Sequence, residues 1–220
     1  MILRRAAVST LAAVAMVTAL SACGSDDNAA PAATNAATTQ TVDVTTDTAT
    51  DTAATVVAQA KLVDPSGAEK GTVTFTEAAG GLDVAVEASD LSPGFHGLHV
   101  HAVGKCEPNS PDPADASKTG NFLSSGGHLA GQEGAGHPDH VGDLPMLQVG
   151  ANGEAKLDAH TDRLTKELLL DADGSSVIVH ESDDNYANIP TRYAAGGADD
   201  ETKKAGDAGA RALCGVVEAP

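Results

Sequence analysis

Apolar and polar residues alternate in several short segments of the chain, and this pattern predicts β-strands. Alternation at a period of two is clearest in residues 55–64, 71–78 and 82–91. Because successive side chains of a strand point to opposite faces, this period is typical of a strand at a core surface. Further strand signals cover residues 94–103, 145–161, 175–180 and 212–218. Seven or eight short strands separated by turn signals predict an antiparallel sandwich or barrel.

Two long stretches between these strands lack apolar periodicity. Residues 105–143 are rich in Gly, Pro, Asn and Ser, and residues 183–210 form a second stretch of this kind. A loop of that length inside a compact domain is usually functional. The segment 163–171 fits either a strand or a short helical turn. Asn152-Gly153, within the segment 145–161, is a strong hairpin signal.

Residues 1–22 have the pattern of an export signal. Arg4 and Arg5 precede an apolar run, residues 6–20, that is too short to span a membrane comfortably. The following Leu-Ser-Ala-Cys resembles the lipobox of bacterial lipoproteins, in which Cys23 is lipidated and becomes the new N-terminus. An ordinary signal peptide or a buried helix is the alternative, but the chain turns polar directly after Cys23. We therefore expect a lipoprotein on the outer face of the bacterial cell membrane.

The rest of the chain divides into a tether and one domain. Residues 23–55 consist largely of Ala, Thr, Asp and Asn and cannot bury enough surface to offset the entropy of ordering. Residues 56–220 have the length of a single domain, and their core must consist of β-branched and small residues because aromatic residues are only 2% of the chain.

The charge balance limits the partners that the protein can have. The chain has 31 acidic and 13 basic residues, and loss of Arg4 and Arg5 leaves a mature net charge of −20. This negative balance argues against nucleic acid and against electrostatic adhesion to anionic lipid. Membrane attachment would then depend on the lipid at Cys23 alone. No apolar surface stripe indicates an oligomeric state, and a homodimer is compatible with the sequence.

The remaining cysteines are expected to form a disulfide. With Cys23 assigned to the lipid, Cys106 and Cys214 are left as a pair. Export implies an oxidising compartment, where two free thiols are uncommon. A bridge that closes so long a loop stabilises a fold by about 2–4 kcal/mol.

Four histidines have the pattern of a copper site. His99 and His101 are two residues apart on an expected strand, so both imidazoles share one face. Two imidazoles on an otherwise apolar strand are costly to bury unless something binds them. His128 follows two glycines, which allow close approach, and His180 ends the expected strand 175–180. Imidazole nitrogens suit copper, which has the highest affinity in the divalent first-row series.

A second cluster adds a carboxylate to imidazoles. His137, His140 and Asp143 have the spacing H-x2-H-x2-D, and with one more imidazole they make a four-coordinate set that fits zinc. Pro138 disfavours a helix at His137, so these ligands must converge through a turn. The alternative is a solvated polar loop whose histidines bind nothing.

Two further histidines are interpreted without a metal. His96 is three residues from His99 and faces the other side of the strand, so we expect a buried structural hydrogen bond. His160 ends an expected surface strand and should be solvated.

Five separated motifs resemble the copper/zinc superoxide dismutases of the bacterial exported type. They are GFHGLHVHAVGKC (94–106), GGHLAG (126–131), HVGDLP (140–145), VIVHESDDN (177–185) and GARALCGVV (209–217). The resemblance covers approximately residues 56–218 and implies an eight-stranded Greek-key β-barrel with long metal-binding and electrostatic loops.

The resemblance also implies the role of each site residue. It implies copper on His99, His101, His128 and His180, and zinc on His128, His137, His140 and Asp143. His128 would be the imidazole shared by both metals. Asp184 matches the carboxylate that orients ligands of both metals. Arg211 matches the arginine at the mouth of the copper channel, and Cys106 and Cys214 match the two cysteines of the family's disulfide.

The implied reaction converts two superoxide anions and two protons to dioxygen and hydrogen peroxide, with copper cycling between Cu(II) and Cu(I). His128 would leave the reduced copper, take a proton and help to deliver it, while Arg211 would draw and dock the anion. Lys203 and Lys204 are candidates for steering superoxide past the negative net charge; a solvated loop of mixed charge explains them equally well.

Several residues depart from the family pattern. The two-residue spacer between His137 and His140 is shorter than usual, Leu98 stands for the usual Phe, and Leu213 for the usual Ala. The loop 185–197 resembles that of actinobacterial members, some of which lack part of the zinc set. The zinc assignment is therefore supported by fewer sequence features than the copper assignment. A non-catalytic copper-binding or copper-buffering lipoprotein on the same fold is the main alternative, and a zinc-only interaction module would leave His99, His101 and His180 unexplained.

Overall fold

The computed structural model describes residues 54–220. The strands are β1 (Val56–Val63), β2 (Glu69–Ala78), β3 (Gly81–Ala88), β4 (Gly94–His96), β5 (Leu98–His101), β6 (Ser110–Asp112), β7 (Asp115–Gly120), β8 (Leu147–Val149), β9 (Ala155–Thr161), β10 (Ser176–His180) and β11 (Arg211–Glu218). The helices are η1 (Leu123–Ser125, 3-10), α1 (Lys166–Leu169) and α2 (Thr202–Ala205). The expected signal peptide, Cys23 and nearly all of the tether lie outside the described residues. Within 54–220 no helix has the length and apolarity needed to cross a membrane.

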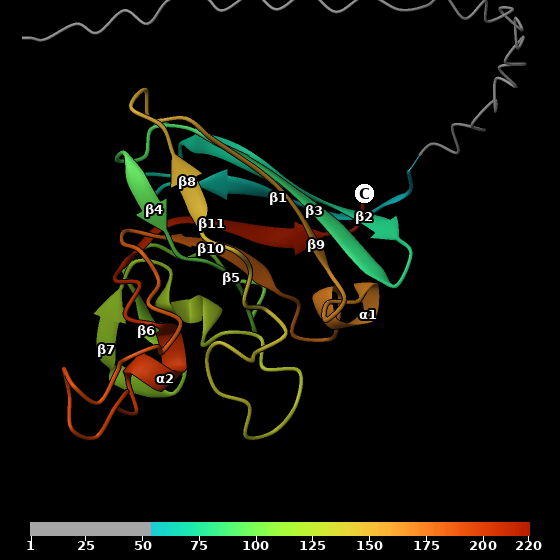
Figure 1. Ribbon diagram of the computed structural model, residues 1–220. Helices are drawn as coiled ribbons and strands as arrows, with labels where there is room; N and C mark the ends of the chain where they lie inside the picture. Colours follow the sequence, from blue (N-terminus) through green and yellow to red (C-terminus); the bar gives the residue numbers. More distant parts are fainter. Residues whose placement is uncertain (1–53) are drawn as a thin grey trace, which may run out of the picture. The chain divides into compact units, whose positions relative to one another are not determined.

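Nine of the described strands form one antiparallel sheet that closes into a barrel (Figure 1). Their order is β4-β8-β9-β3-β2-β1-β11-β10-β5. The two ends of this order, β4 and β5, are consecutive in the chain and are separated only by Gly97. The single segment 94–101 therefore pairs with β8 through its first half and with β10 through its second half. Counted as one strand, it makes the eight-stranded barrel that the sequence predicts.

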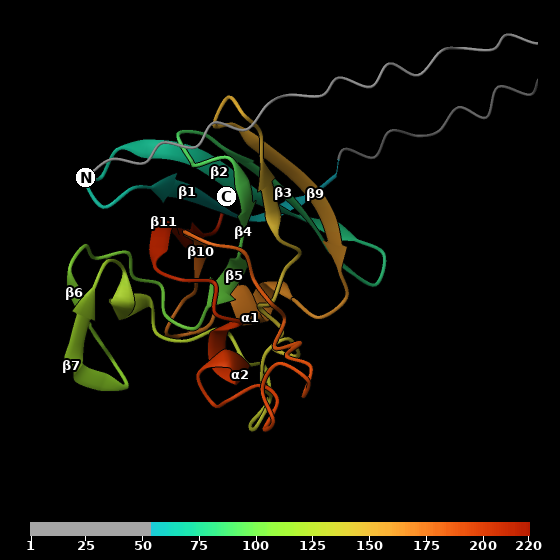
Figure 2. The ribbon, with the colours of Figure 1, turned by 60° about the vertical axis from the view of Figure 1, so that its left-hand side comes forward.

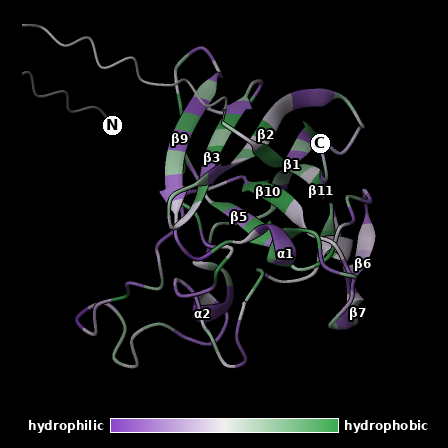
Figure 3. Ribbon diagram, turned by 90° about the vertical axis from the view of Figure 1, so that its right-hand side faces the viewer, coloured by the Kyte–Doolittle hydropathy of each residue, from purple (hydrophilic) through white to green (hydrophobic). Residues whose placement is uncertain are grey.

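The strands remote from the loops follow the expected alternation. Burial alternates with exposure along β3, which pairs in continuous register with β2 and β9. Figure 3 shows the same alternation of polar and apolar residues along β3 and β9. The inward residues form one apolar core of Val, Leu and Ala, with Phe75 as its only aromatic member in the part of the chain that is described. The core therefore has the composition that the low aromatic content predicts.

Strands β5 and β10 differ because every one of their residues is buried. Val177 and Val179 belong to the barrel core, whereas Ile178 packs on the opposite face against Phe122 and Cys214. The outer face is covered because the two long loops, yellow-green and orange, lie on that side of the barrel (Figures 1 and 2). This part of the barrel is consequently the place where loop residues meet strand residues in a dry environment.

The long loops contain more regular structure than the sequence predicts. The stretch 105–143 includes the β6–β7 hairpin and η1, and α2 lies within 183–210. The hairpin could not be predicted from apolar periodicity, because β7 is exposed on both faces and has no apolar side to produce an alternating pattern. The undecided segment 163–171 contains the helix α1, whose first turn is capped by the Thr165 side chain accepting from Leu168 N at 3.3 Å.

The expected disulfide is confirmed. Cys106 and Cys214 are bonded, with 5.6 Å between their Cα atoms. Cys214 lies on β11, so the bond fastens the start of the first long loop to the barrel wall.

Candidate metal centre

The candidate centre is built on the outward face of β5. His99 and His101 share this face, as their spacing predicts, and are at most 1% exposed. Leu98 and Val100 alternate with them and point into the barrel core. The strand therefore holds two imidazoles rigidly on the side that the loops cover.

The free edge of β5 is paired with the first long loop. Val100 N donates to Gly142 O, and Leu129 N donates to Val100 O, both at 2.8 Å. A side chain at 142 would overlap the carbonyl of Val100, so only glycine permits this approach. The pairing places His128 opposite His101 and Asp143 opposite His99. Residues far apart in the sequence thus enter one site because they complete a sheet edge.

The four histidines predicted for copper come together. His180 ends β10, the strand paired with β5, and His128 comes from the loop edge. One ring nitrogen from each of His99, His101, His128 and His180 lies within 4.8 Å of the other three, and all four residues are buried.

Six buried ring nitrogens in this region have no hydrogen-bond partner. They are His99 Nδ1, His101 Nε2, His128 Nε2, His137 Nδ1, His140 Nδ1 and His180 Nε2. Native proteins rarely leave buried polar atoms unsatisfied, and each such atom normally has an explanation such as a bound ion. The six belong to the six predicted histidine ligands and to no other described residue. The donor set therefore fits two metal ions.

The other nitrogen of several of these rings is held by a partner. His101 Nδ1 donates to Gly126 O at 2.8 Å, and His180 Nδ1 donates to Gly209 O at 3.0 Å. His99 Nε2 donates to Asp184 at 2.8 Å. Such hydrogen bonds fix the tautomer, so that the lone pair of the opposite nitrogen points into the site.

Asp143 is the centre of the second subsite. Its carboxylate lies 2.7 Å from His128 Nδ1, 3.1 Å from His137 Nδ1 and 3.2 Å from His140 Nδ1. The four side chains are those predicted for zinc, and they converge through the turn that Pro138 predicts. The set whose ligand atoms all lie within 4.8 Å of one another contains His99 in place of His140. His140 contacts Asp143, and its ring centroid is 5.4 Å from that of His128, the same distance as for His137.

Burial keeps three imidazoles of the copper set neutral. It lowers the pKa of His128 to about 4 and that of His180 to about 3, and it lowers the pKa of His101 well below the ordinary value. Neighbouring imidazoles and the Arg211 cation add to the effect at His101 and His180. A neutral imidazole is the form that binds a single metal, so His101 and His180 need lose no proton, and His128 would lose one only on binding a second metal.

The second subsite has the opposite electrostatics. Burial lowers the pKa of His137, but the carboxylates of Asp143 and Asp184 outweigh it and raise that pKa to about 9. Burial disfavours the Asp143 carboxylate, yet its hydrogen bond with His128 and its close contacts with the His137 and His140 rings hold its pKa well below the usual range. A buried anion is stable here only when cations or hydrogen-bond donors surround it.

Asp184 connects the two subsites. Its Oδ2 accepts from His99, and its Oδ1 accepts from His137 Nε2 at 2.8 Å and from Tyr186 N at 2.7 Å. These hydrogen bonds overcome the effect of burial and lower the pKa of Asp184. The carboxylate is 4% exposed and has the position expected of a residue that orients ligands in both subsites.

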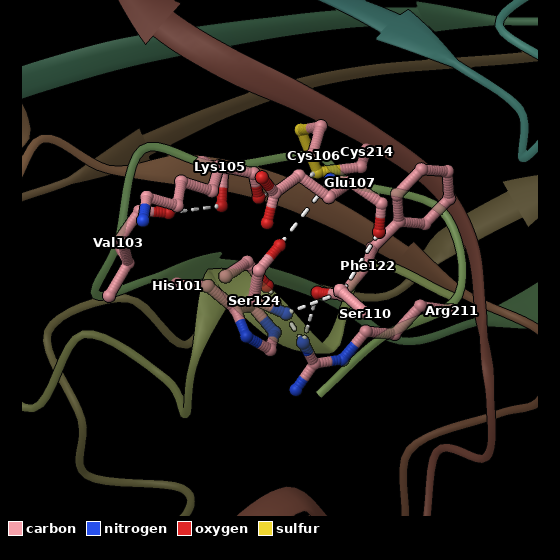
Figure 4. Close-up of a disulfide and its surroundings, with 12 residues drawn as sticks. His101, Val103, Lys105, Cys106, Glu107, Ser110, Phe122, Ser124, Arg211 and Cys214 are labelled. Carbon is pink, nitrogen blue, oxygen red and sulfur yellow. Dashed lines mark hydrogen bonds between the residues drawn. A yellow bond between two sulfur atoms is a disulfide. The ribbon is translucent and has the colours of Figure 1, made fainter. Parts of the chain in front are cut away.

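Arg211 is fixed beside the copper set (Figure 4). Its guanidinium donates to Phe122 O at 2.6 Å, to Ser125 Oγ at 2.7 Å and to Gly126 O at 2.7 Å. Figure 4 shows the guanidinium beside His101, in the same view as the disulfide, whose Cys214 lies with Arg211 on β11. Burial lowers the pKa of Arg211 to about 10, so it remains a cation at neutral pH.

Four contributing residues carry no signal that sequence reasoning used. Ser125 holds Arg211, and Tyr186 stacks on His137 at an angle of 8° while its hydroxyl accepts from Met146 N. Gly206 packs against Asp184, and Arg163 contacts the zinc-loop backbone. These residues have common types and no distinctive spacing, so the sequence contains no signal that would identify them.

The remaining polar residues follow their expectations in part. His96 is 2% exposed, and its ring nitrogens lie 2.6 Å from His180 O and 2.8 Å from Ser92 O, so its structural hydrogen bonds are confirmed. His160 is exposed and pairs with Asp83 at 2.9 Å. Lys204 pairs with Glu201, and Lys203 O accepts from His137 N. A steering role for Lys203 and Lys204 stays a prediction.

Comparison with known proteins decides the family. The family model described as "Copper/zinc superoxide dismutase (SODC)" matches residues 69–217. The chain belongs to the copper/zinc superoxide dismutase family. A relative named Superoxide dismutase [Cu-Zn] from Mycobacterium tuberculosis is 43% identical over 164 residues, which cover 71% of this chain and 68% of the relative. One of the same name from Deinococcus radiodurans is 33% identical and covers 73% of this chain and 84% of the relative.

Solved structures agree with this membership. The Cu/Zn superoxide dismutase from Brucella abortus has a TM-score of 0.58 at 32% identity and covers 73% of this chain and 99% of that one. A SOD-like protein from Bacillus subtilis has a TM-score of 0.54 at 28% identity, with coverage of 71% and 95%. The family's copper and zinc match the two donor sets found in the fold.

Proposed function

We propose that this protein is a superoxide dismutase that converts two superoxide anions and two protons to dioxygen and hydrogen peroxide. The observation that carries the proposal is the set of six buried ring nitrogens without partners, arranged in two adjoining subsites. Family membership supports the same reaction. When bound, copper supplies the one-electron chemistry by alternating between Cu(II) and Cu(I).

The chain's own residues supply binding, orientation and protons. His99, His101, His128 and His180 would hold copper; the pairing of β5 with β10 keeps the first two and His180 in place, and the loop edge opposite His101 places His128. His128 Nε2 is the atom at which a proton is held for delivery to the product. Its other nitrogen, Nδ1, faces Asp143 in the zinc subsite, so this one ring borders both subsites and would serve both metals.

The zinc subsite fixes the loop and the shared ring. His128, His137, His140 and Asp143 would hold zinc, and Asp184 orients His99 and His137 from outside. The short spacer between His137 and His140 does not keep their Nδ1 atoms from the same carboxylate. This convergence supports zinc in a chain that departs from the family's usual spacing.

Arg211 binds the substrate anion. Three acceptors fix its guanidinium, so no conformational entropy is lost when superoxide docks. A fixed cation in a partly buried site also acts more strongly than one in water. Local positive potential at this position offsets the negative net charge of the molecule.

Copper buffering without catalysis is the competing function on the same fold. A buffer needs the four histidines but has no use for a cation fixed beside them. The three hydrogen bonds of Arg211 therefore favour the dismutase.

Metal analysis combined with an activity assay tests these assignments. His180→Ala should remove copper and activity, and His140→Ala should lower zinc content while copper stays at one per chain. His160→Ala is the matched control, because His160 is exposed and lies outside both subsites. Full activity in His180→Ala contradicts the copper assignment, and unchanged zinc in His140→Ala contradicts the zinc assignment. Copper binding without superoxide consumption would favour the buffer.

We also propose that the protein is exported and anchored to the outer face of the cell membrane by lipid on Cys23. The support is the signal pattern of residues 1–22 and the polar tether that follows. Cys23→Ala should move the protein from the membrane fraction to the soluble exported fraction. Membrane association that persists in this variant would contradict the proposal.

A further inference from the structure

A guanidinium group fastens the short zinc loop from outside. Arg163 Nη1 donates to Pro138 O at 3.2 Å, and Nη2 donates to Asp143 O at 2.9 Å. The two carbonyls belong to residues on either side of His140. One side chain therefore brackets the segment that carries two zinc-subsite ligands, His140 and Asp143.

Arg163 is itself attached to the barrel. It follows β9 by two residues, and its main-chain N–H donates to Thr161 Oγ1 at 3.3 Å. The next residue, Leu164, is fully buried in the barrel core. The guanidinium thus projects from a fixed base, and its planar fork matches two acceptors at once.

The side of the loop that Arg163 covers faces solvent. A recess of about 410 Å³ lies there, with Pro138, Asp143, Arg163 and Tyr186 among its lining residues. The opposite side of the loop pairs with the edge of β5 through Gly142. An outward displacement of the segment 138–143 is the movement that would separate His140 and Asp143 from the shared His128.

We propose that Arg163 is a positioning residue of the zinc subsite, which retains zinc by holding the segment 138–143 against the barrel. The inference rests on the proposed zinc site. Partners that orient metal ligands from outside typically change metal affinity by about 10- to 100-fold when removed. Arg163 contacts none of the copper histidines, and three of these are carried by β5 and β10, so we expect the effect to fall on zinc.

The charge of Arg163 and its hydrogen bonds predict opposite changes in zinc affinity when Arg163 is replaced. A guanidinium cation repels a zinc ion nearby, so its removal would strengthen zinc binding if charge alone mattered. Loss of the two hydrogen bonds releases the loop and weakens zinc binding. The direction of the change therefore separates the two effects.

The test measures zinc release from the full copper- and zinc-loaded protein to a chromophoric chelator, with copper content followed in the same samples. Arg163→Ala should release zinc about 10- to 100-fold faster with unchanged copper retention. Arg163→Lys should show a smaller acceleration, because an ammonium group cannot match both carbonyls in one plane. Arg192→Ala is the control, since Arg192 is an exposed arginine that stacks on Tyr193 in the other loop.

Each other outcome overturns the inference. Zinc release that is unchanged or slower in Arg163→Ala leaves the zinc site standing but removes the role of Arg163. Loss of copper together with zinc indicates a general structural role instead. If Arg163→Ala does not fold, the rate of zinc release from Arg163→Lys is compared with that of the wild type instead, and a rate that is not faster overturns the inference. A wild-type protein that binds no zinc overturns the proposed zinc site and this inference together.

Discussion

The backbone at Gly206 lies against the Asp184 carboxylate so closely that no side chain fits between them. A Cβ at residue 206 would overlap Asp184 Oδ1 and would lie 2.6 Å from His137 Nε2. Gly206 also has φ of 58°, a left-handed conformation that favours glycine. A backbone atom of the second long loop thereby sets the position of a carboxylate that orients ligands in both metal subsites.

Gly206→Ala should weaken binding of both metals. The new methyl group displaces Asp184 from His99 and His137, and we expect about a 10- to 100-fold loss of affinity for each metal, measured by chelator competition. Gly67→Ala is the control, because Gly67 has φ of 85° and no atom within 4 Å of an added Cβ. It reproduces the backbone strain without the collision. Equal effects of the two substitutions would show that strain, and not the contact with Asp184, is responsible.

Zinc binding should depend on pH in a range where copper binding does not. The pKa of His137 is raised to about 9 in the metal-free protein, so zinc must displace a proton from this ring below that pH. Apparent zinc affinity should therefore rise by about tenfold per pH unit from pH ~7 to ~9 and then level off. His128 and His180, with pKa values of about 4 and about 3, are already neutral there. Titration against a competing chelator checks this, and a zinc affinity that is flat across the range would contradict it.

Removal of the disulfide should destabilise the metal-free protein. The Cys106–Cys214 bond joins residues 108 positions apart, so its loss frees a long loop in the unfolded chain. The double variant Cys106→Ala/Cys214→Ala should lose about 2–5 kcal/mol of unfolding free energy, measured with urea. Reduction of the wild-type protein should give a similar loss, and a reductant should have no effect on the variant. A stability equal to that of the oxidised wild type would refute the expectation.

Ser125→Ala should impair substrate docking without loss of copper. The hydroxyl accepts one of the three hydrogen bonds that fix Arg211, and the other two acceptors remain. We expect kcat/KM to fall about three- to tenfold, or about 1 kcal/mol, with copper content unchanged. Ser117→Ala removes an exposed hydroxyl from β7 and should leave kcat/KM as it was. A normal kcat/KM in Ser125→Ala would mean that Phe122 O and Gly126 O suffice to hold the guanidinium.

The strands and the copper histidines were predictable because their signals are local. Alternation along β3 follows directly from a strand with one face on a core. His99 and His101 share a face because side chains of a strand alternate with a period of two. Two histidines at positions i and i+2 therefore predict two metal ligands on the same face. The β6–β7 hairpin was not predictable in this way, since β7 has no buried face to leave an apolar pattern.

The sequence by itself determined the alternating strands, the paired cysteines and the kinds of ligand that the histidines and Asp143 could supply. Only the tertiary structure decided that the segment 94–101 closes the barrel, that the first loop completes the edge of β5, that the backbone at Gly206 packs against Asp184, and that Arg163 holds the segment 138–143 through two carbonyls. Those relationships join residues far apart in the chain through main-chain carbonyls and close packing. No residue type or spacing encodes such contacts, because the groups involved are present in every peptide unit.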